Sequence, residues 1–307
     1  MELISFILPL YNKAATINRA ISSIVNQNNF DMYNPEIVIV NDGSTDNSLS
    51  IIDKSFLDKL SIYSINNSGV SVARNFGVSK SKGHIIFFLD CDDELLDNAL
   101  NLIYSTLSKY PDFDFYSGSI ELTNENGISN SKILKHYSIL NNNFYLNFIV
   151  NPFLLTSSSS YFRRDFFNKF SGFPESFVRG EDIYLWLLMG LKGKFYSSKF
   201  AISRIYRNAV NRSANVNIAN LQLPYFLTYF LLNEEGLRFF KKNLNLRLLI
   251  YWLSIKNMLG FKELGIQILA DKIVEVMFKY SIVMGSIFYL FSLMPIKFIS
   301  HLRALRN

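Results

Sequence analysis

The stretch IIFFLDCDDE, residues 85–94, joins five apolar residues to four carboxylates within the next five positions. The apolar run predicts a strand that is buried on both faces, because it offers no polar side chain to water. Unpaired carboxylates beside a core cost free energy, so a positive group has to meet them. That group is a basic side chain, a metal ion, or a metal that carries a phosphorylated ligand, and this stretch alone leaves the choice open.

Short apolar runs alternate with longer amphipathic segments around this stretch. We predict strands at residues 3–10, 35–40, 60–65, 84–90, 112–122 and 155–162. We predict helices at residues 15–27, 49–57, 70–81, 97–110 and 181–191. Strands separated by helices of this length predict βαβ units and a mostly parallel sheet. The fold class is therefore α/β.

Polar residues follow two of the predicted strands at the point where each strand ends. Asn41 and Asp42 come after one strand, and the acidic cluster comes after another. Ligands of open α/β sheets bind beyond the carboxyl ends of the strands. The sequence therefore places a binding site at this edge.

Composition excludes several classes of function. The single cysteine, Cys91, and three scattered histidines cannot form a disulfide or a Cys/His zinc site, which fits a reducing cytoplasm. The formal charge of +6 is moderate, and no stripe of Lys and Arg interleaved with aromatic residues indicates nucleic-acid binding. The N-terminus has no basic region ahead of an apolar core, so it reads as a strand rather than as a signal peptide.

From about residue 221 the sequence pattern changes to long helical runs rich in Leu, Phe and Tyr. We therefore predict a domain at residues 1–213 and a helical, membrane-associating region at residues 214–307. Residues 280–296 carry no charge and are followed by Lys297, Arg303 and Arg306. A buried core helix and a membrane span are open alternatives, but basic flanks favour a helix that lies in the membrane surface.

Five motifs occur in one order along the first domain. They are ILPLYNK (7–13), EIVIVNDGSTDNS (36–48), NNSGVSVARNFG (66–77), FFLDCDD (87–93) and RGEDIYLW (179–186). Together they resemble the family 2 glycosyltransferases, which are inverting enzymes of GT-A fold. The resemblance covers roughly residues 1–213 and implies a nucleotide-diphospho-sugar transferase domain of Rossmann-like architecture.

Asp90, Cys91 and Asp92 form a DxD pattern. Clustered carboxylates are hard oxygen ligands that suit Mg²⁺ or Mn²⁺, and such an ion would bridge to a diphosphate. The resemblance implies that Asp92 is the usual metal ligand, that Asp90 faces the ribose or the metal, and that Asp93 supports the loop. The alternative is a solvated cluster that caps the following helix.

The resemblance assigns the nucleotide base to the loops after the first two strands. It implies that Asp42 accepts a hydrogen bond from uracil and that the Tyr11 ring stacks on the base, with Pro9 and Asn12 completing the loop. An Asp acceptor opposite an N–H donor and a ring against the base face are sound recognition chemistry. Alternatively, Asp42 serves only a turn or a helix cap.

The same resemblance assigns the binding of the diphosphate to arginine side chains. Arg74 matches a guanidinium placed near the metal, and Gly69 shapes the start of its helix. Tyr206 and Arg207 match a lid that closes on the diphosphate in many relatives. This chain departs from that lid at Ala209, where relatives have a histidine that can ligate the metal. A third protein ligand is therefore absent or is supplied by another residue.

The resemblance also names a catalytic base. An inverting transfer needs one carboxylate to take the proton of the attacking hydroxyl. The base implied here is Asp182, with Glu181 holding the acceptor or orienting the loop. Otherwise both acids serve only the helix dipole, and we expect Trp186 in the same helix to be core.

The sequence therefore predicts transfer of a single sugar from a nucleoside diphosphate sugar, most readily UDP-linked, to a hydroxyl of a glycan or of a polyprenyl-diphosphate-linked acceptor. The implied setting is bacterial O-antigen, capsule or lipooligosaccharide synthesis at the inner face of the cytoplasmic membrane, peripheral to it. A protein that binds nucleotide sugars without turnover remains an alternative. A DxD-type phosphatase is a weaker alternative, because Glu94 stands where a hydroxyl residue normally follows the DxD.

Overall fold

The computed structural model describes residues 2–123, 132–134, 139–140, 144–150, 154–176 and 180–206, together with six single positions beyond them. The chain divides into two compact units, one of residues 1–177 with 181–213 and the other of residues 178–180 with 214–307. The predicted interfacial segment at 280–296 lies outside the described residues. Within the part of the chain that the structure describes, no helix has the length and apolar character needed to cross a bilayer.

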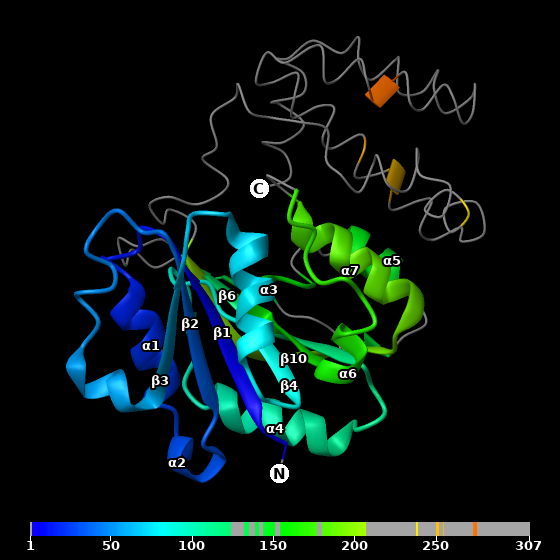
Figure 1. The fold of residues 1–307 in the computed structure, drawn as a ribbon. Coiled ribbons are helices and arrows are strands. Elements are labelled where there is room, and N and C mark those ends of the chain that lie inside the picture. Colours follow the sequence, from blue (N-terminus) through cyan, green and yellow to red (C-terminus); the bar gives the residue numbers. More distant parts are fainter. Residues whose placement is uncertain are drawn as a thin grey trace. The chain divides into compact units, whose positions relative to one another are not determined.

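The first unit is built from one sheet and the helices beside it (Figure 1). The strands are β1 (Ile4–Leu10), β2 (Glu36–Asp42), β3 (Leu60–Ile65), β4 (Ile85–Phe88), β5 (Glu94–Leu95), β6 (Phe115–Thr123), β7 (Lys132–Leu134), β8 (Ile139–Leu140), β9 (Ser160–Arg163) and β10 (Phe195–Tyr206). The helices are α1 (Ile17–Val25), α2 (Phe30–Tyr33), α3 (Val70–Lys80), α4 (Ala99–Lys109), α5 (Phe144–Val150), α6 (Arg164–Phe167) and α7 (Glu181–Lys192), with 3₁₀ turns η1 (Lys54–Lys59) and η2 (Ser157–Ser159).

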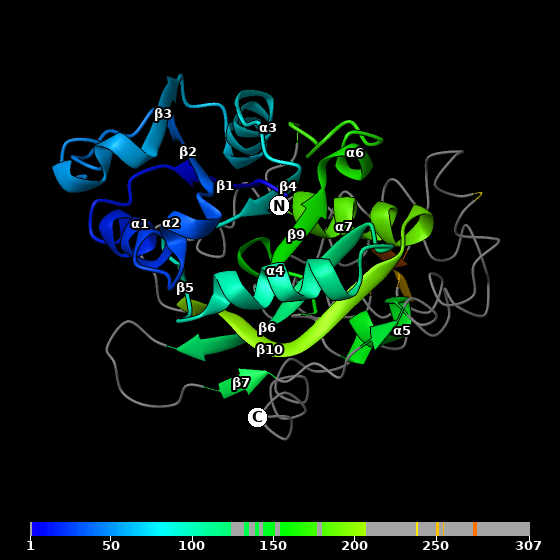
Figure 2. The same cartoon turned by 90° about the horizontal axis from the view of Figure 1, so that it is seen from below.

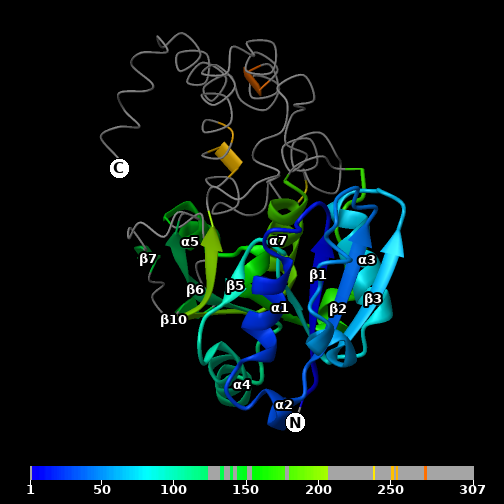
Figure 3. The ribbon, with the colours of Figure 1, turned by 90° about the vertical axis from the view of Figure 1, so that its left-hand side faces the viewer.

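The strands follow the order β3-β2-β1-β4-β9-β6-β10-β5, with β7 paired to β6 and β8 to β10. β1, β2, β3 and β4 are parallel, so their carboxyl ends share one edge of the sheet. Figure 3 shows β1, β2 and β3 pointing to that edge. β9 runs antiparallel to both β4 and β6, whereas β10 is parallel to β6. The prediction of a mostly parallel sheet is thus right for the first half of this unit and wrong for its second half. There the chain between β6 and β9 contains not only a helix but also β7 and β8, which pair antiparallel to β6 and β10.

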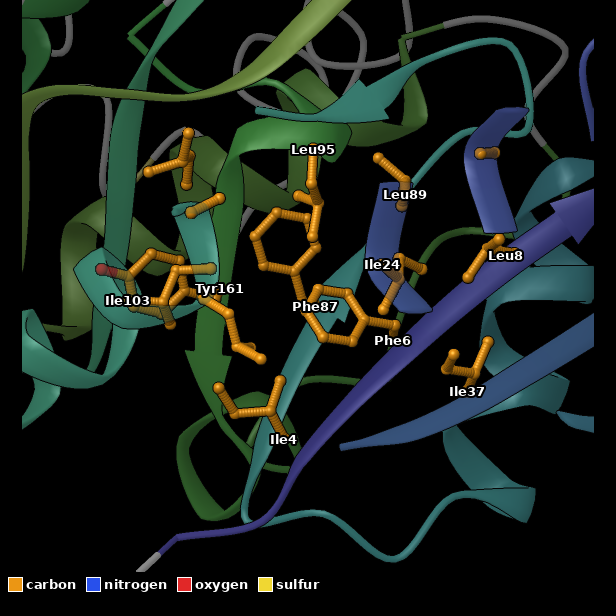
Figure 4. Close-up of a cluster of buried hydrophobic side chains, with 14 of the residues drawn as sticks. Ile4, Phe6, Leu8, Ile24, Ile37, Phe87, Leu89, Leu95, Ile103 and Tyr161 are labelled. Atoms are coloured by element: carbon orange, nitrogen blue, oxygen red, sulfur yellow. The ribbon is translucent and has the colours of Figure 1, made fainter. Parts of the chain in front are cut away.

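Each face of the sheet is covered by a layer of helices (Figure 2). Alternate residues of β1, such as Phe6 and Leu8, join a core with Ile24 of α1 and Ile103 of α4 (Figure 4). The intervening side chain of Ile7 faces α3, and this helix approaches closely because residue 77 is a glycine. A Cβ on Gly77 would lie 2.4 Å from a methyl carbon of Ile7.

α7 covers the same face as α3, farther along the sheet (Figure 2). The Trp186 ring stacks on Phe162 of β9 at 4.9 Å between centroids and is fully buried, which confirms its expected place in the core. Phe173, in the segment that leads into α7, packs against both Trp186 and Phe88 of β4. These aromatic contacts hold α7 against β9 and, through Phe173, against β4.

Two predicted elements differ from the structure. Residues 49–57 form turns followed by η1 rather than a helix, and the Asp53 side chain caps η1 by accepting from the backbone N–H of Ser55 at 2.9 Å. Leu49 and Ile51 are exposed, so the segment has no apolar stripe to bury. The predicted strand at 155–162 begins later, after η2, where the Thr156 and Ser159 side chains form a capping box.

Candidate active site

The loops after β1 and β2 are tied together at the carboxyl edge of the sheet. The Asn12 side chain accepts from the backbone N–H of Thr45 at 2.8 Å, and Ser44 Oγ accepts from the N–H of Asn12 at 3.1 Å. Asn12 adopts a φ of +51°, which asparagine tolerates better than most residues. Beside this junction Pro9 lies within β1, while the Tyr11 side chain is 40% exposed and therefore accessible to a ligand.

Asp42 ends β2 and reaches the beginning of α3. Its two carboxylate oxygens accept from the backbone N–H groups of Ser68 at 2.7 Å and Gly69 at 2.9 Å. Gly69 is the N-cap of α3 and has a φ of +93°, a conformation that favours glycine. Asp42 therefore holds the two residues just ahead of α3 and does not cap the helix itself, and each of its oxygens retains a second lone pair for another donor.

Two basic side chains meet the acidic cluster that follows β4. Asp90, Asp92 and Asp93 have carboxylate oxygens within 4.8 Å of one another. Arg74 Nη2 lies 2.8 Å from Asp90 Oδ1, and Lys13 Nζ lies 2.9 Å from Asp92 Oδ2. The buried strand thus ends in a cluster of carboxylates that the protein itself partly neutralises.

Asp93 holds the acidic loop in place. It is almost fully buried, and its carboxylate accepts from Ser158 Oγ at 2.6 Å and from the backbone N–H of Tyr206 at 3.2 Å. Because both of its oxygens serve these contacts, Asp93 is a poorer candidate for a metal ligand than its neighbours.

The donor set fits a divalent cation. Asp90 and Asp92 each have one oxygen that receives no hydrogen bond from the described residues, and the Asp90 side chain is 34% exposed. Hard carboxylate oxygens suit Mg²⁺ or Mn²⁺, which keeps several waters or takes ligands from a phosphate. Asp92 and Asp90 would hold such an ion.

Arg74 joins the acidic loop to the start of α7. Its guanidinium is 2.8 Å from Asp90 Oδ1 through Nη2 and 3.1 Å from Glu181 Oε1 through Nη1. Burial alone would lower the pKa of Arg74, but Asp90 and Glu181 outweigh it and raise that pKa, so the group stays cationic. The ring of Phe173 lies 5.1 Å from the guanidinium carbon.

Asp182 sits in the first turn of α7, next to Glu181. Burial raises its pKa to about 7, the charge of Glu181 adds to that rise, and Arg74 opposes it. The side chain still keeps part of its surface accessible to solvent. A carboxylate with these properties can take up a proton near neutral pH, which is what a general base needs.

The end of β10 is fastened to the same region. The Tyr206 hydroxyl donates to Glu94 Oε1 at 3.0 Å, and the guanidinium of Arg19 lies 3.7 Å from the centre of the Tyr206 ring. Arg207 and Ala209, the predicted lid positions, lie outside the described residues.

Lys13, Ser158 and Arg19 are site residues that the sequence interpretation did not single out. Lys13 ends the first motif, and Arg19 Nη2 donates to the backbone oxygen of Asp92 at 2.7 Å. The sequence predicts only that positive charge lies near the acidic cluster. It does not identify the residues that supply this charge. Their partners are more than 60 residues away along the chain.

Comparison with known proteins adds the family. The model of Glycosyl transferase family 2 matches residues 5–170. A glycosyltransferase of uncharacterised specificity from Haemophilus influenzae is 33% identical over 47% of this chain and 59% of its own length. The chondroitin synthase of Pasteurella multocida is 29% identical over 76% of this chain, but the match spans only 23% of that synthase.

A Campylobacter jejuni protein matches over more of its length. It is the GalNAc(5)-diNAcBac-PP-undecaprenol beta-1,3-glucosyltransferase, 27% identical over 76% of this chain and 75% of its own. Among solved structures, Staphylococcus aureus TarS residues 1–349 in complex with UDP-GlcNAc aligns with a TM-score of 0.61 at 18% identity, covering 94% of this chain and 89% of that one. This likeness confirms the expected GT-A fold, and the family match accounts for more than half of the chain. The protein belongs to glycosyl transferase family 2.

Proposed function

We propose that this glycosyltransferase moves a single sugar, with inversion and with the help of Mn²⁺ or Mg²⁺, from a UDP-sugar to a hydroxyl of a glycan or polyprenyl-diphosphate-linked acceptor. The proposed pathway class is bacterial surface polysaccharide synthesis, such as O-antigen, capsule or lipooligosaccharide. The proposed location is the cytoplasmic face of the inner membrane, where residues 214–307 would hold the protein to the lipid surface.

One observation carries the proposal: Arg74 connects the acidic loop to the acid pair of α7. The acidic loop is where a metal and a diphosphate would sit, and the acid pair is where a base would sit. A sugar transfer requires these two functions side by side, because the leaving diphosphate and the attacking hydroxyl flank the same anomeric carbon. A cluster that only capped a helix would not need the second acid pair.

The chain's own residues supply positioning and proton transfer in this mechanism. Tyr11 and Asp42 would bind the base, and Arg74 would turn toward the diphosphate oxygens. Asp182 would accept the proton of the acceptor hydroxyl as that oxygen attacks, so the configuration at the anomeric carbon inverts. When bound at Asp92 and Asp90, a divalent cation would stabilise the charge of the departing nucleotide.

The functions of related proteins support the proposed classes of donor and acceptor. TarS has been solved with UDP-GlcNAc and with UDP. The Campylobacter relative acts on a glycan attached to undecaprenol through a diphosphate, and another relative is the minor teichoic acid biosynthesis protein GgaA of Bacillus subtilis. We infer an acceptor of the same chemical kind for this chain.

We expect UDP with Mn²⁺ to raise the melting temperature by roughly 5 °C at a hundredfold excess over Kd, because a ligand of the folded state stabilises it by mass action. The shift should be largest with UDP, smaller with GDP or dTDP, and lost in Asp92→Asn. Differential scanning fluorimetry with each nucleotide, with and without Mn²⁺, measures it.

Asp97→Asn is the matched control. Asp97 follows the same loop but is exposed and stands outside the cluster of carboxylates, so this variant should retain the full shift. Equal shifts in Asp92→Asn and wild type would refute the metal site at Asp92.

The inverting course of the transfer has a test of its own. The ¹H NMR spectrum of the first product formed should show the anomeric configuration opposite to that of the donor.

A further inference from the structure

The β1–α1 loop places Lys13 where a divalent cation would also bind. The Lys13 ammonium lies 2.9 Å from Asp92 Oδ2, and both side chains are largely buried, at 12% and 9% exposed. Asp92 is the expected metal ligand, so one carboxylate serves a permanent cation of the protein and a cation from solution. Two cations on one carboxylate repel each other, more strongly where water is partly excluded.

The backbone of Lys13 is fixed, while its side chain is long. Its N–H donates to Ser48 Oγ at 2.8 Å, and its carbonyl oxygen accepts from the N–H groups of Thr16 and Ile17 at 3.0 Å. These contacts hold Lys13 just ahead of α1, where the helix dipole disfavours positive charge. A lysine there needs a nearby anion, and its four-carbon side chain lets the ammonium move from one anion to another.

Arg19 also contacts Asp92, but in a different way from Lys13. Its guanidinium binds the backbone oxygen of Asp92 rather than the carboxylate. A metal at the carboxylate would leave that contact in place. Arg19 therefore suits a permanent structural role, whereas Lys13 pairs with the carboxylate whose other oxygen would hold the metal.

We propose that Lys13 is an internal counter-ion that competes with the divalent cation for Asp92 and transfers to the diphosphate when donor and metal bind together. The proposal rests on the proposed metal and nucleotide site. It predicts that the metal alone binds weakly and that the nucleotide and metal strengthen each other's binding. Reciprocal coupling of this kind is typically 5- to 150-fold.

The test is a titration of Mn²⁺ followed by electron paramagnetic resonance, with and without UDP. Without nucleotide, Lys13→Met should bind Mn²⁺ roughly tenfold more tightly than wild type, because the competing charge is gone. Lys13→Arg should bind it more weakly than wild type, since a guanidinium pairs with a carboxylate through two donors. UDP should raise the Mn²⁺ affinity of wild type more than that of Lys13→Met.

Lys54→Met is the control for loss of one positive charge, because Lys54 is exposed in η1, and it should match wild type. Equal Mn²⁺ affinity in wild type, Lys13→Met and Lys13→Arg would overturn this inference and leave the proposed function standing. If Lys13→Met does not fold, Lys13→Arg decides the matter by its opposite sign. Failure of every variant to bind Mn²⁺, with or without UDP, would overturn the metal-dependent function and this inference together.

Discussion

Replacing Asp182 with Asn should lower kcat about a thousandfold and leave the binding of UDP with Mn²⁺ within about twofold of wild type. The amide keeps the size and the hydrogen-bond capacity of the side chain but cannot accept the proton of the acceptor hydroxyl. Asp182 lies in α7, whereas the proposed nucleotide contacts come from the loops after β1, β2 and β4 and from Arg74 in α3. Initial rates and calorimetric titration of UDP separate the two effects.

The pH dependence gives this prediction a second measurement. The pKa of Asp182 is raised to about 7, so kcat/KM of wild type should rise with pH up to about 7 and then level off. Glu181 contributes to that raised pKa, so Glu181→Gln should move the rise to lower pH. A rise centred near the ordinary pKa of an aspartate would contradict the assignment.

The stability of the folded protein should depend on pH in the opposite direction to kcat/KM. Because the folded-state pKa of Asp182 is above the unfolded value, the folded protein holds a proton between pH 4 and 7 that the unfolded chain has released. The stability that this group contributes is therefore present at low pH and lost as the pH rises through about 7. Asp182→Asn should consequently melt at a higher temperature than wild type at pH 8, with a smaller difference at pH 5.

The control for Asp182→Asn is Asp165→Asn. Asp165 is an exposed acid in the first turn of α6, so it shares the helix-dipole position of Asp182 without its surroundings. This variant should keep wild-type kcat and show no stabilisation at pH 8. If both variants retained most of the activity, the acids of α7 would serve only the helix start.

Local patterns predicted the parts of the fold that depend on local physics. The apolar run at residues 85–89 is buried and contains strand β4, and Ile17, Ile21 and Ile24 form the buried stripe of α1. The helix predicted at residues 49–57 does not form, because the turn residues ahead of it are not followed by a periodic apolar face. The antiparallel insertion of β9 depends on pairings between distant segments that no local pattern encodes.

In the candidate site, too, local motifs predicted some residues, whereas contacts between distant segments could not be predicted. Family motifs pointed to Asp90, Asp92 and Glu181. The structure places Asp90 and Glu181 against Arg74, and Asp92 lies beside Asp90 in the same cluster. Which oxygen each cation takes could not be predicted, because Lys13 and Asp92 are 79 positions apart in the chain. Charge balance predicted that a cation would be present, and only the three-dimensional fold identified it. The roles of these residues in catalysis remain predictions.

Replacing Arg74 with Met should destabilise the protein by about 3 kcal/mol at pH 7.5, because removal of one partner leaves buried charge unpaired. Arg74 is 4% exposed and contacts both Asp90 and Glu181. We take the lower end of the expected range because the Asp90 side chain is 34% exposed and can regain water. Urea unfolding followed by circular dichroism measures the loss.

The deficit should shrink as the pH falls toward 5, because Asp182, whose pKa is raised to about 7, is then protonated and has no charge for Arg74 to stabilise. Arg164→Met is the control, because Arg164 is partly buried but donates to the backbone oxygens of Gly83 and Val78 and to Ser81 Oγ. Its loss should destabilise the protein with much less dependence on pH. A pH-independent deficit in both variants would show that Arg74 acts through packing alone.

The same variant should affect catalysis through Asp182. Arg74 lowers the pKa of Asp182, so its removal should move the rise of kcat/KM with pH to values above about 7. Activity at the plateau should still fall roughly a hundredfold, because the guanidinium proposed to face the diphosphate is missing. An unshifted profile at reduced rate would separate the two roles, leaving Arg74 as a diphosphate contact that has no influence on the base. A shifted profile would show that one guanidinium sets the charge of the base while it faces the leaving group.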